Sequence, residues 1–379
     1  MYKFGNLIDG QWTDGAAAEF NTVNPARPSS VVGNYSAASP GQIAEAVGVA
    51  VKAQRSWRAK PATDRVAAFE AFLKLLELAS DDLARSITLE QGKPLAEAKG
   101  EVAKSIAEAR FMAGEALRGH SAVMPSARSG IRNMVIRRPR GVIAAITPWN
   151  FPILTPLRKL APAIVFGNAV IMKPSEYSPS TTALMADIGR KALPSGVLQV
   201  VNGRGETGSA LVGSAGIAGV TFTGSVATGK SIYAMAAENL AEISLELGGK
   251  NAAVINDSND LESCLNQITA AACMCAGQRC TAISRIIAHR SLYDAVVEGL
   301  ARRCRSMVLG DGMEPTTTMG PLVNARQLAR VAAMVDKGVG EGARVVTGGS
   351  IARISGLEDG YFYAPTVLAD VTASMSIAR

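Results

Sequence analysis

The chain has 379 residues, of which 48% are hydrophobic, 37 are glycine and 17 are proline. This composition allows a sizeable core spread over two or three domains, and it excludes a disordered or collagen-like chain. The net charge is +7, from 39 basic and 32 acidic residues. So small a surplus predicts solubility and a mild preference for anions, and it says nothing about the fold.

The cysteine pattern favours a reducing compartment, because five cysteines lie in the last third of the chain without forming a disulfide framework. No run of about 18 apolar residues is present, and the N-terminus lacks the layout of a signal peptide. We therefore expect a cytoplasmic protein with no membrane partner. The two histidines, His120 and His289, are too few for a His-rich metal site, and no metal is predicted.

The first half of the chain divides into a helical segment and an arginine-rich segment. Residues 40–117 carry apolar side chains at helical spacing, with breaks near Pro61 and at residues 92–94, and predict a layer of helices. Residues 128–140, RSGIRNMVIRRPR, surround a short strand-like core with arginines. We interpret them as an exposed hairpin or an oligomerisation arm. A nucleic-acid patch is disfavoured because no aromatic residues interleave the arginines.

Short apolar runs then alternate with helical segments, which predicts βαβ units on a parallel sheet. Residues 250–379 begin a second such region, with strand-like NAAVIN and ISRIIAH and with helices from Leu261 and Ser291. The fold class is therefore α/β. The predicted strands of the first sheet are residues 141–147, 168–174, 198–203, 219–225 and 243–249.

Ligands of open parallel sheets bind beyond the carboxyl ends of the strands, and two motifs there carry suitable polar groups. In residues 147–152, TPWNFP, prolines fix the backbone on each side of Asn150, whose amide NH2 would donate to a developing oxyanion. A proline-rich turn capped by Asn150 is the alternative. Residues 173–176, KPSE, would hold a ribose between Lys173 and Glu176, or form a surface turn.

Residues 222–231, FTGSVATGKS, are predicted to form a strand end, a turn and a helix start. Backbone N–H groups and the helix dipole at such a turn favour a phosphate. The segment from Gly224 to Ser231 also fits the P-loop spacing, so a phosphotransferase is a rival class. No acidic strand end stands out that would hold the Mg²⁺ such an enzyme needs.

The last motifs are residues 246–250, ELGGK, and 277–281, GQRCT. Glu246 ends a strand beside two glycines, which leave room for a ligand. Cys280 follows Arg279, whose positive charge would favour the thiolate form. The spacing of the cysteines around residue 275, without a histidine, is a poor zinc pattern.

Taken in chain order, PWNFP, KPSE, FTGS, ELGGK and GQRC make the chain resemble the NAD(P)-dependent aldehyde dehydrogenase superfamily, from about residue 5 to the end. This order disfavours the P-loop interpretation. The resemblance implies a Rossmann-like NAD-binding domain with its helical layer, a small hairpin oligomerisation arm and an α/β catalytic domain. Their expected ranges are residues 1–119 with 141–245, residues 120–140, and residues 246–379.

The resemblance also implies roles for single residues. Cys280 matches the nucleophile, Asn150 with the Cys280 backbone N–H matches the oxyanion hole, and Glu246 matches the general base that activates water. The reaction would pass through a thiohemiacetal and a thioester to a carboxylic acid. The implied cofactor contacts are Thr147, Trp149, Lys173, Ser175, Glu176, Gly224, Ser225 and Leu247.

Two arguments concern cofactor and substrate. The Glu176 carboxylate accepts from a ribose 2′-OH but repels a 2′-phosphate, so we expect NAD rather than NADP. Arg158 resembles the arginine that succinate-semialdehyde dehydrogenases place in the aldehyde tunnel, and Arg279 adjoins the nucleophile. A guanidinium clamps a carboxylate bidentately, which favours succinate or 2-oxoglutarate semialdehyde as the small-molecule substrate. Structural ion pairs are the alternative for both arginines.

The family pattern continues beyond Arg379 with a Glu-Glu-x-Phe-Gly-Pro segment that holds the nicotinamide ribose, and later with a strand used in subunit pairing. The chain is thus expected to be C-terminally truncated, with an incomplete catalytic domain. Two hypotheses follow: an NAD-dependent semialdehyde dehydrogenase, and a remnant that is inactive or binds only the cofactor. The homo-oligomer expected of the full-length family transfers poorly to a truncated chain.

Overall fold

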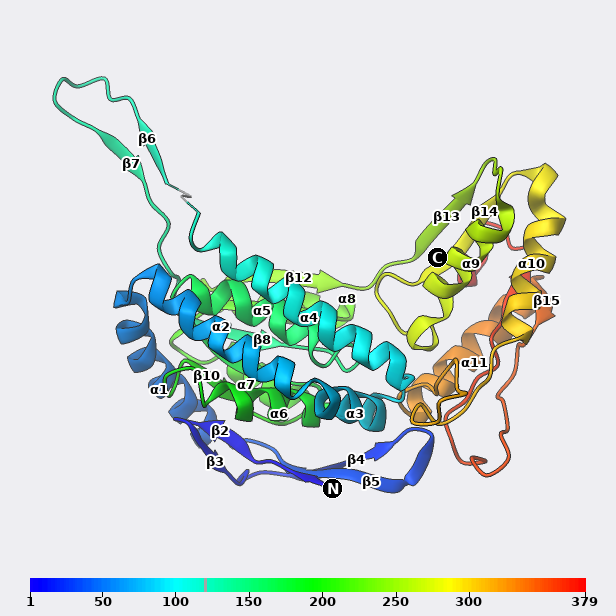
Figure 1. The fold of residues 1–379 in the computed structure, drawn as a ribbon, viewed down its shortest axis with the longest axis horizontal. Helices are drawn as coiled ribbons and strands as arrows, with labels where there is room; N and C mark the ends of the chain where they lie inside the picture. The colour runs from blue at the N-terminus through cyan, green and yellow to red at the C-terminus, as the bar shows by residue number, and fades with distance from the viewer. Residues whose placement is uncertain (119–120) are drawn as a thin grey trace.

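Figure 1 shows the chain as a computed structural model that describes residues 1–118 and 121–379. The N-terminal residues form strands that the sequence patterns did not predict. Strands β4 and β5 form an antiparallel hairpin with β1 parallel to β5, while β2 and β3 extend the main sheet. Their bounds are β1 (Tyr2–Lys3), β2 (Asn6–Ile8), β3 (Gln11–Thr13), β4 (Glu19–Asn24) and β5 (Arg27–Ser36).

The helices predicted for residues 40–117 are confirmed and number four, but they do not form one layer, because the first packs mainly on the opposite face of the main sheet from the second and fourth. Ser39 caps the first of them in a capping box with Gln42, and Pro61 precedes the second. Gly92 ends the third in the left-handed conformation, at φ 93°. The bounds are α1 (Pro40–Ala59), α2 (Ala62–Leu78), α3 (Ser80–Gln91) and α4 (Leu95–Glu115).

The five predicted strands of the main sheet are also confirmed. They run parallel in the order β12-β11-β8-β9-β10, with β2 and β3 added antiparallel beyond β10. The chain leaves β8 toward β9 and β10, then returns to place β11 on the other side of β8, so a topological switch point lies between β8 and β11. The bounds are β8 (Val142–Ile146), β9 (Ala169–Lys173), β10 (Leu198–Val200), β11 (Ile217–Gly224) and β12 (Glu242–Leu247).

Alternate residues of each strand point to opposite faces of this sheet, and each face has its own core. Ala145 and Met172 pack on one face with residues of α2, α4, α5 and α6, whereas Ala144 and Ile171 pack on the other with α1, α7 and α8. The crossover helices are α5 (Leu154–Val165), α6 (Pro179–Gly189), α7 (Gly205–Val212) and α8 (Val226–Glu238).

The predicted hairpin is formed by β7 (Asn133–Val135), from the arginine-rich segment, and β6 (Ala122–Met124), just before it, and it projects from the body in Figure 1. Every residue of both strands is exposed. The predicted first residue of this arm, His120, and the predicted end of the preceding segment, residue 119, lie outside the described residues. Its part in oligomerisation stays a prediction.

The C-terminal lobe follows β12 and contains small two-stranded sheets. Strands β13 and β14 pair in parallel, and β15 and β16 antiparallel. The helix expected from Ser291 begins as a 3-10 turn, η2 (Arg290–Leu292), before α10. The other bounds are β13 (Asn251–Ile255), α9 (Leu261–Cys273), η1 (Met274–Gly277), β14 (Ile283–Ala288), α10 (Tyr293–Arg305), α11 (Ala325–Gly340), β15 (Arg344–Thr347), β16 (Val367–Ala369) and η3 (Ser376–Ala378). Over the described ranges, no helix is long and apolar enough to cross a bilayer.

A buried carboxyl group ties the N-terminal strands to the helices. Glu90, on α3, accepts hydrogen bonds from the Thr22 hydroxyl at 2.7 Å and from the backbone N–H of Ser180, on α6, at 2.8 Å. Burial raises the pKa of Glu90 from 4.5 to about 7, and these hydrogen bonds only partly oppose the rise. Folding therefore favours the protonated carboxyl group at weakly acidic pH.

We predict that Glu90→Gln, which mimics the protonated group, becomes relatively more stabilising as the pH rises. Between pH 4.5 and 7 the folded wild type holds a proton that the unfolded chain has lost, so wild-type stability falls through this window. The full effect is about 3 kcal/mol. Melting temperatures of variant and wild type, compared at each pH from 5 to 8, check this. A difference independent of pH would contradict it.

Candidate active site

The loop after β8 connects the sheet to the segment that precedes Cys280. The Thr147 backbone N–H donates to the carbonyl of Lys173 at 3.2 Å, so the loop begins beside the end of β9. The Asn150 side-chain amide donates to the carbonyl of Gln278 at 2.7 Å. The structure thus brings Asn150 together with residues 273–281, which contain the predicted nucleophile Cys280 and are named here the nucleophile loop. The two bonded residues, Asn150 and Gln278, are 128 positions apart in sequence.

The nucleophile loop contains an unusual turn. Cys275 and Ala276 both lie in the left-handed region, with φ of 57° and 52°, and Gly277 follows at 70°. Left-handed non-glycine residues cost on the order of 1–3 kcal/mol each, so they persist only where surrounding contacts hold them. Gln278 supplies two such contacts, donating to the Cys275 carbonyl at 3.0 Å and accepting from the Val323 N–H at 3.0 Å. Cys280 is exposed just after this turn.

Glu246 and Leu247 are adjacent on β12 and therefore point to opposite faces of the sheet. Leu247 packs with the core under α8, while Glu246 is exposed on the α5 side. Lys159, on α5, is buried there and donates to the Thr221 hydroxyl at 2.9 Å. Burial lowers the pKa of Lys159 to about 8, against the opposing charge of Glu246. Lys159 was not among the residues predicted from the sequence, although a lysine within an otherwise apolar helical stripe is a signal for it.

Arg158 has a partner within the protein. Its Nε donates to Glu108 Oε2 at 2.6 Å and its Nη2 to Oε1 at 3.0 Å, a bidentate pair with α4. These bonds raise the pKa of Arg158, and the charges of Cys280 and Glu246 contribute in the same direction. Arg158 thus lies close enough to both predicted catalytic residues for their charges to affect its pKa. Two of its N–H groups are already bonded to Glu108.

The Arg279 side chain contacts residues of its own loop. Its Nη1 contacts Met274 Sδ at 3.4 Å and its Nη2 donates to the Thr281 hydroxyl at 3.3 Å, while Nε is buried without a hydrogen-bond partner among the described residues. Burial raises the pKa of Glu97, on α4, and the charge of Arg279 is one of those that oppose this rise. Arg279 therefore lies near Glu97.

Three glutamates of α4 hold different parts of this region, and the sequence analysis missed all three. They are Glu97, Glu101 and Glu108, spaced four and seven residues apart and hence on one face of the helix. Glu97 accepts from the Cys275 N–H, Glu101 from the N–H groups of residues 153 and 154, and Glu108 from Arg158. An acidic stripe along an alanine-rich helix was the available signal.

The start of α8 offers a site for an anion. Gly224 ends β11, and Ser225 is the N-cap, its hydroxyl accepting from the Thr228 N–H at 3.2 Å. The first turn of this 13-residue helix is exposed, so its N–H groups and positive dipole end are open to a phosphate. Lys230, which the P-loop spacing would place on that phosphate, lies inside the helix and is exposed.

The end of β9 carries a lysine and a carboxylate. The Lys173 ammonium is buried and donates to the carbonyls of Pro174 and Gly203, each at 2.7 Å, which leaves one of its three N–H groups for a ligand. Burial lowers the pKa of Lys173 to about 8, while the charges of Glu176 and Glu206 oppose this. The Ser175 hydroxyl contacts Glu176 at 3.5 Å.

Trp149 shares this edge, because its carbonyl accepts from the Ser178 hydroxyl at 3.1 Å. An exposed helix start and a lysine beside a carboxylate, at the carboxyl ends of β9 and β11, fit the phosphate and ribose of a dinucleotide. Across the part of the chain that the structure describes, no three His, Cys, Asp or Glu residues are arranged to hold a metal ion.

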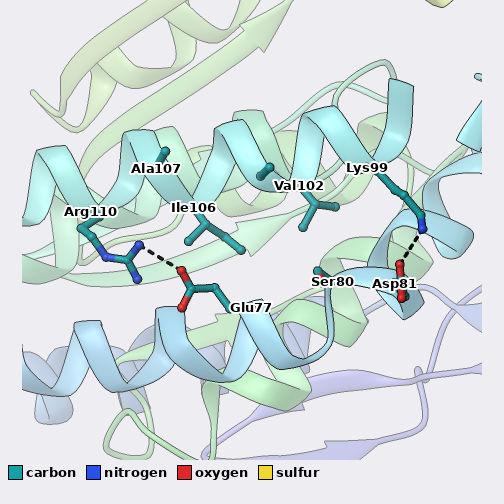
Figure 2. A pocket seen from close by; sticks show the side chains of 9 residues that line it. Glu77, Ser80, Asp81, Lys99, Val102, Ile106, Ala107 and Arg110 are labelled. Carbon is teal, nitrogen blue, oxygen red and sulfur yellow. Dashed lines mark hydrogen bonds and ion pairs between the residues drawn. The ribbon is translucent and has the colours of Figure 1, made fainter. Parts of the chain in front are cut away.

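The groove in Figure 2 lies elsewhere, between α4 and the junction of α2 and α3. Its floor contains Val102 and Ile106, and ion pairs border it, between Arg110 and Glu77 at 3.0 Å and between Lys99 and Asp81 at 2.9 Å. None of the predicted catalytic or cofactor residues lines it, so it is separate from the candidate active site.

Known proteins are similar to this chain over nearly all of its length. The model of the aldehyde dehydrogenase family matches residues 12–379. The alpha-ketoglutaric semialdehyde dehydrogenase of Bacillus subtilis (strain 168) is 34% identical over 99% of this chain and 77% of its own length. The NADP(+) succinate-semialdehyde dehydrogenase of Escherichia coli (strain K12) is 33% identical over 100% and 78%.

A solved structure supports the same assignment. The NAD+ complex of an aldehyde dehydrogenase from Bacillus cereus superposes with a TM-score of 0.96 at 33% identity, over 100% of this chain and 77% of that one. The predicted α/β fold is confirmed, and with it the resemblance that the ordered motifs indicated. The chain belongs to the aldehyde dehydrogenase family.

Proposed function

We propose that this chain oxidises a carboxylated semialdehyde to the carboxylic acid, with Cys280 as nucleophile, Asn150 as oxyanion donor and Glu246 as general base. The observation that carries the proposal is the 2.7 Å hydrogen bond from the Asn150 amide to the Gln278 carbonyl. This bond fixes an amide donor against the loop that presents the exposed Cys280, as acyl chemistry at a thiolate requires.

The first half of the reaction forms a bond between carbon and sulfur. The Cys280 thiolate attacks the aldehyde carbon, and the carbonyl oxygen becomes an oxyanion to which the second N–H of the Asn150 amide donates. Bound NAD or NADP supplies the acceptor for the hydride that leaves this carbon. Loss of the hydride converts the thiohemiacetal on Cys280 into a thioester.

The second half returns the thiolate. Glu246 accepts a proton from water, whose oxygen attacks the thioester carbon, and the carbon–sulfur bond breaks to release the acid and the Cys280 thiolate. The exposed position of Glu246 on β12 gives water access to it. Lys159 is buried on the same side of the sheet and donates to the Thr221 hydroxyl.

For the substrate carboxylate we propose Arg158 rather than Arg279. The charges of Cys280 and Glu246 contribute to the raised pKa of Arg158, whereas Arg279 lies beside Glu97. The Arg158 guanidinium has five donors and uses two on Glu108, so others remain for a substrate.

We predict that Arg158→Ala raises KM for succinate semialdehyde at least about tenfold while KM for butanal, a neutral aldehyde of equal chain length, stays within about twofold. Glu108→Gln, the matched variant, weakens the internal competitor for the guanidinium and is expected to lower KM for succinate semialdehyde. Steady-state kinetics with both aldehydes check this. Equal changes for the two aldehydes would reject the clamp and leave Arg158 as a structural partner of Glu108.

For the cofactor we propose NAD over NADP. The charges of Glu176 and Glu206 both raise the pKa of Lys173 at the end of β9. This edge of the sheet therefore carries two negative charges that repel a ribose 2′-phosphate. A single pair of charges at 4 Å is worth up to about 4 kcal/mol at an effective dielectric near 20, before solvent screening reduces it.

The experiment that tests the proposed function follows absorbance of the reduced cofactor during turnover of succinate semialdehyde, with NAD and with NADP in parallel. We expect turnover with both and a higher kcat/KM with NAD. A higher value with NADP would reject the cofactor preference. Binding of NAD without turnover would support the alternative of a cofactor-binding remnant.

A further inference from the structure

We propose that Lys93, Glu97 and Glu101, here named the α4 brace, position the oxyanion loop and the nucleophile loop relative to each other. The inference rests on the proposed roles of Asn150 and Cys280, and it assigns Lys93 as a positioning residue for them. None of the three residues belongs to the motifs that carry the family resemblance.

Lys93 and Glu101 form a buried ion pair, with Nζ to Oε2 at 2.6 Å and each side chain 1% exposed. The same ammonium donates to the backbone carbonyl of Asn150 at 2.8 Å and lies 4.2 Å from the ring centroid of Phe151. Lys93 therefore contacts both Asn150 and the next residue, while the Asn150 side-chain amide bonds to Gln278.

The second carboxylate oxygen of Glu101 binds the same loop directly. Oε1 accepts from the backbone N–H groups of Ile153 and Leu154, both at 3.2 Å, where α5 begins. One carboxylate thus binds the segment after Asn150 directly and the Asn150 carbonyl through Lys93. The loop from residue 150 to residue 154 is fixed at both of its ends by a single buried pair.

Glu97 lies one turn earlier on the same face of α4 and holds the other loop. Its Oε2 accepts from the backbone N–H of Cys275 at 2.8 Å, at the first of the two left-handed non-glycine residues. Gln91 adds a second link, because it accepts from the Lys93 N–H at 3.1 Å and donates to Cys275 Sγ at 3.2 Å. The start of α4 therefore holds both loops.

A tight turn at Gly92 directly precedes Lys93. Gly92 has φ of 93°, and a Cβ on it would come within 2.7 Å of side-chain atoms of Pro25 and Pro321, so glycine is required. This turn points Lys93 into the protein between α3 and α4. A displacement of 1 Å between reacting groups costs on the order of 10² in rate. Holding Lys93 rigidly therefore serves catalysis, because Lys93 in turn holds Asn150.

The test uses a reaction that needs Cys280 and the oxyanion donor but no cofactor, namely acylation of Cys280 by p-nitrophenyl acetate with release of p-nitrophenolate. Lys93→Met leaves Glu101 charged and buried, and this single variant risks misfolding. The informative variant is Lys93→Met with Glu101→Gln, which removes both charges and keeps an acceptor for residues 153 and 154. The matched control is Lys99→Met, which breaks the exposed pair with Asp81 seen in Figure 2.

We expect the double variant to slow acylation tenfold or more, while alkylation of Cys280 by iodoacetamide, which forms no oxyanion, stays within twofold. Hydrogen exchange is expected to accelerate in peptides covering residues 148–154 and to remain unchanged in the control. Wild-type acylation together with unchanged exchange would overturn the brace. Equal losses of acylation and alkylation would also overturn it, because they indicate general loosening.

A second pair of variants tests the other loop. Glu97→Ala removes the acceptor of the Cys275 N–H and is expected to accelerate exchange over residues 273–281, whereas Glu97→Gln keeps an oxygen there and is expected to restore slow exchange. If wild-type acylation proves equal to that of Cys280→Ala, the proposed function fails. The exchange results still decide whether the brace holds the loops.

Discussion

Replacing Cys280 by alanine is expected to abolish turnover of succinate semialdehyde, lowering kcat by more than about 10⁴-fold. Without the sulfur no thiohemiacetal forms, so there is no tetrahedral carbon from which hydride can leave. Binding of NAD is expected to persist, because the α8 start and the Lys173 edge do not involve this side chain. Reduced-cofactor formation and a nucleotide titration, made on one sample, measure both.

Cys264→Ala is the control, because Cys264 lies half-buried on α9 away from the left-handed turn. It is expected to retain wild-type turnover. Stoichiometric labelling of the wild type adds a second check, since Cys280 is exposed whereas Cys275 and Cys304 are buried, so Cys280 is expected to react first. Residual activity above a hundredth of wild type in Cys280→Ala would contradict the assignment of the nucleophile.

The centre of the main sheet was predictable because β8 and β9 are continuous apolar runs, each followed by a motif. Buried on both faces, β8 and β9 need apolar residues at successive positions, and their sequences show them. The N-terminal strands gave no such signal. Strand β2 has three residues and pairs with β10 through Leu7 and Val200, so its pairing depends on contacts far along the chain.

The candidate site divides in the same way. Residues within short motifs, such as Asn150 and Cys280, were predictable because the chemistry and its spacing lie in adjacent residues. The α4 brace was not, because Glu101 and Asn150 are brought together only by the packing of α4 on α5. The partner of Arg158 was missed for the same reason. Its bidentate pair with Glu108 spans 50 residues, and neither sequence neighbourhood indicates the other.

Replacing Asn150 by alanine is expected to lower kcat with succinate semialdehyde by about 10²–10³, the usual cost of losing one oxyanion donor. The KM for NAD is expected to change little, because most of the proposed dinucleotide contacts lie at the ends of β9 and β11. Acylation by p-nitrophenyl acetate is expected to fall by a similar factor, since it passes through the same oxyanion without hydride transfer. Stopped-flow release of p-nitrophenolate measures this step directly.

The alanine variant also removes the bond to the Gln278 carbonyl, so the loss of the donor has to be separated from a displaced nucleophile loop. Alkylation of Cys280 by iodoacetamide does this, because it needs the thiolate in place and no oxyanion. We expect alkylation within about threefold of wild type while acylation falls at least about a hundredfold. Asn150→Asp sharpens the comparison, since a carboxylate there repels both the oxyanion and the Gln278 carbonyl and should acylate more slowly still. Parallel losses of acylation and alkylation would instead make Asn150 a support of the loop rather than a donor to the substrate.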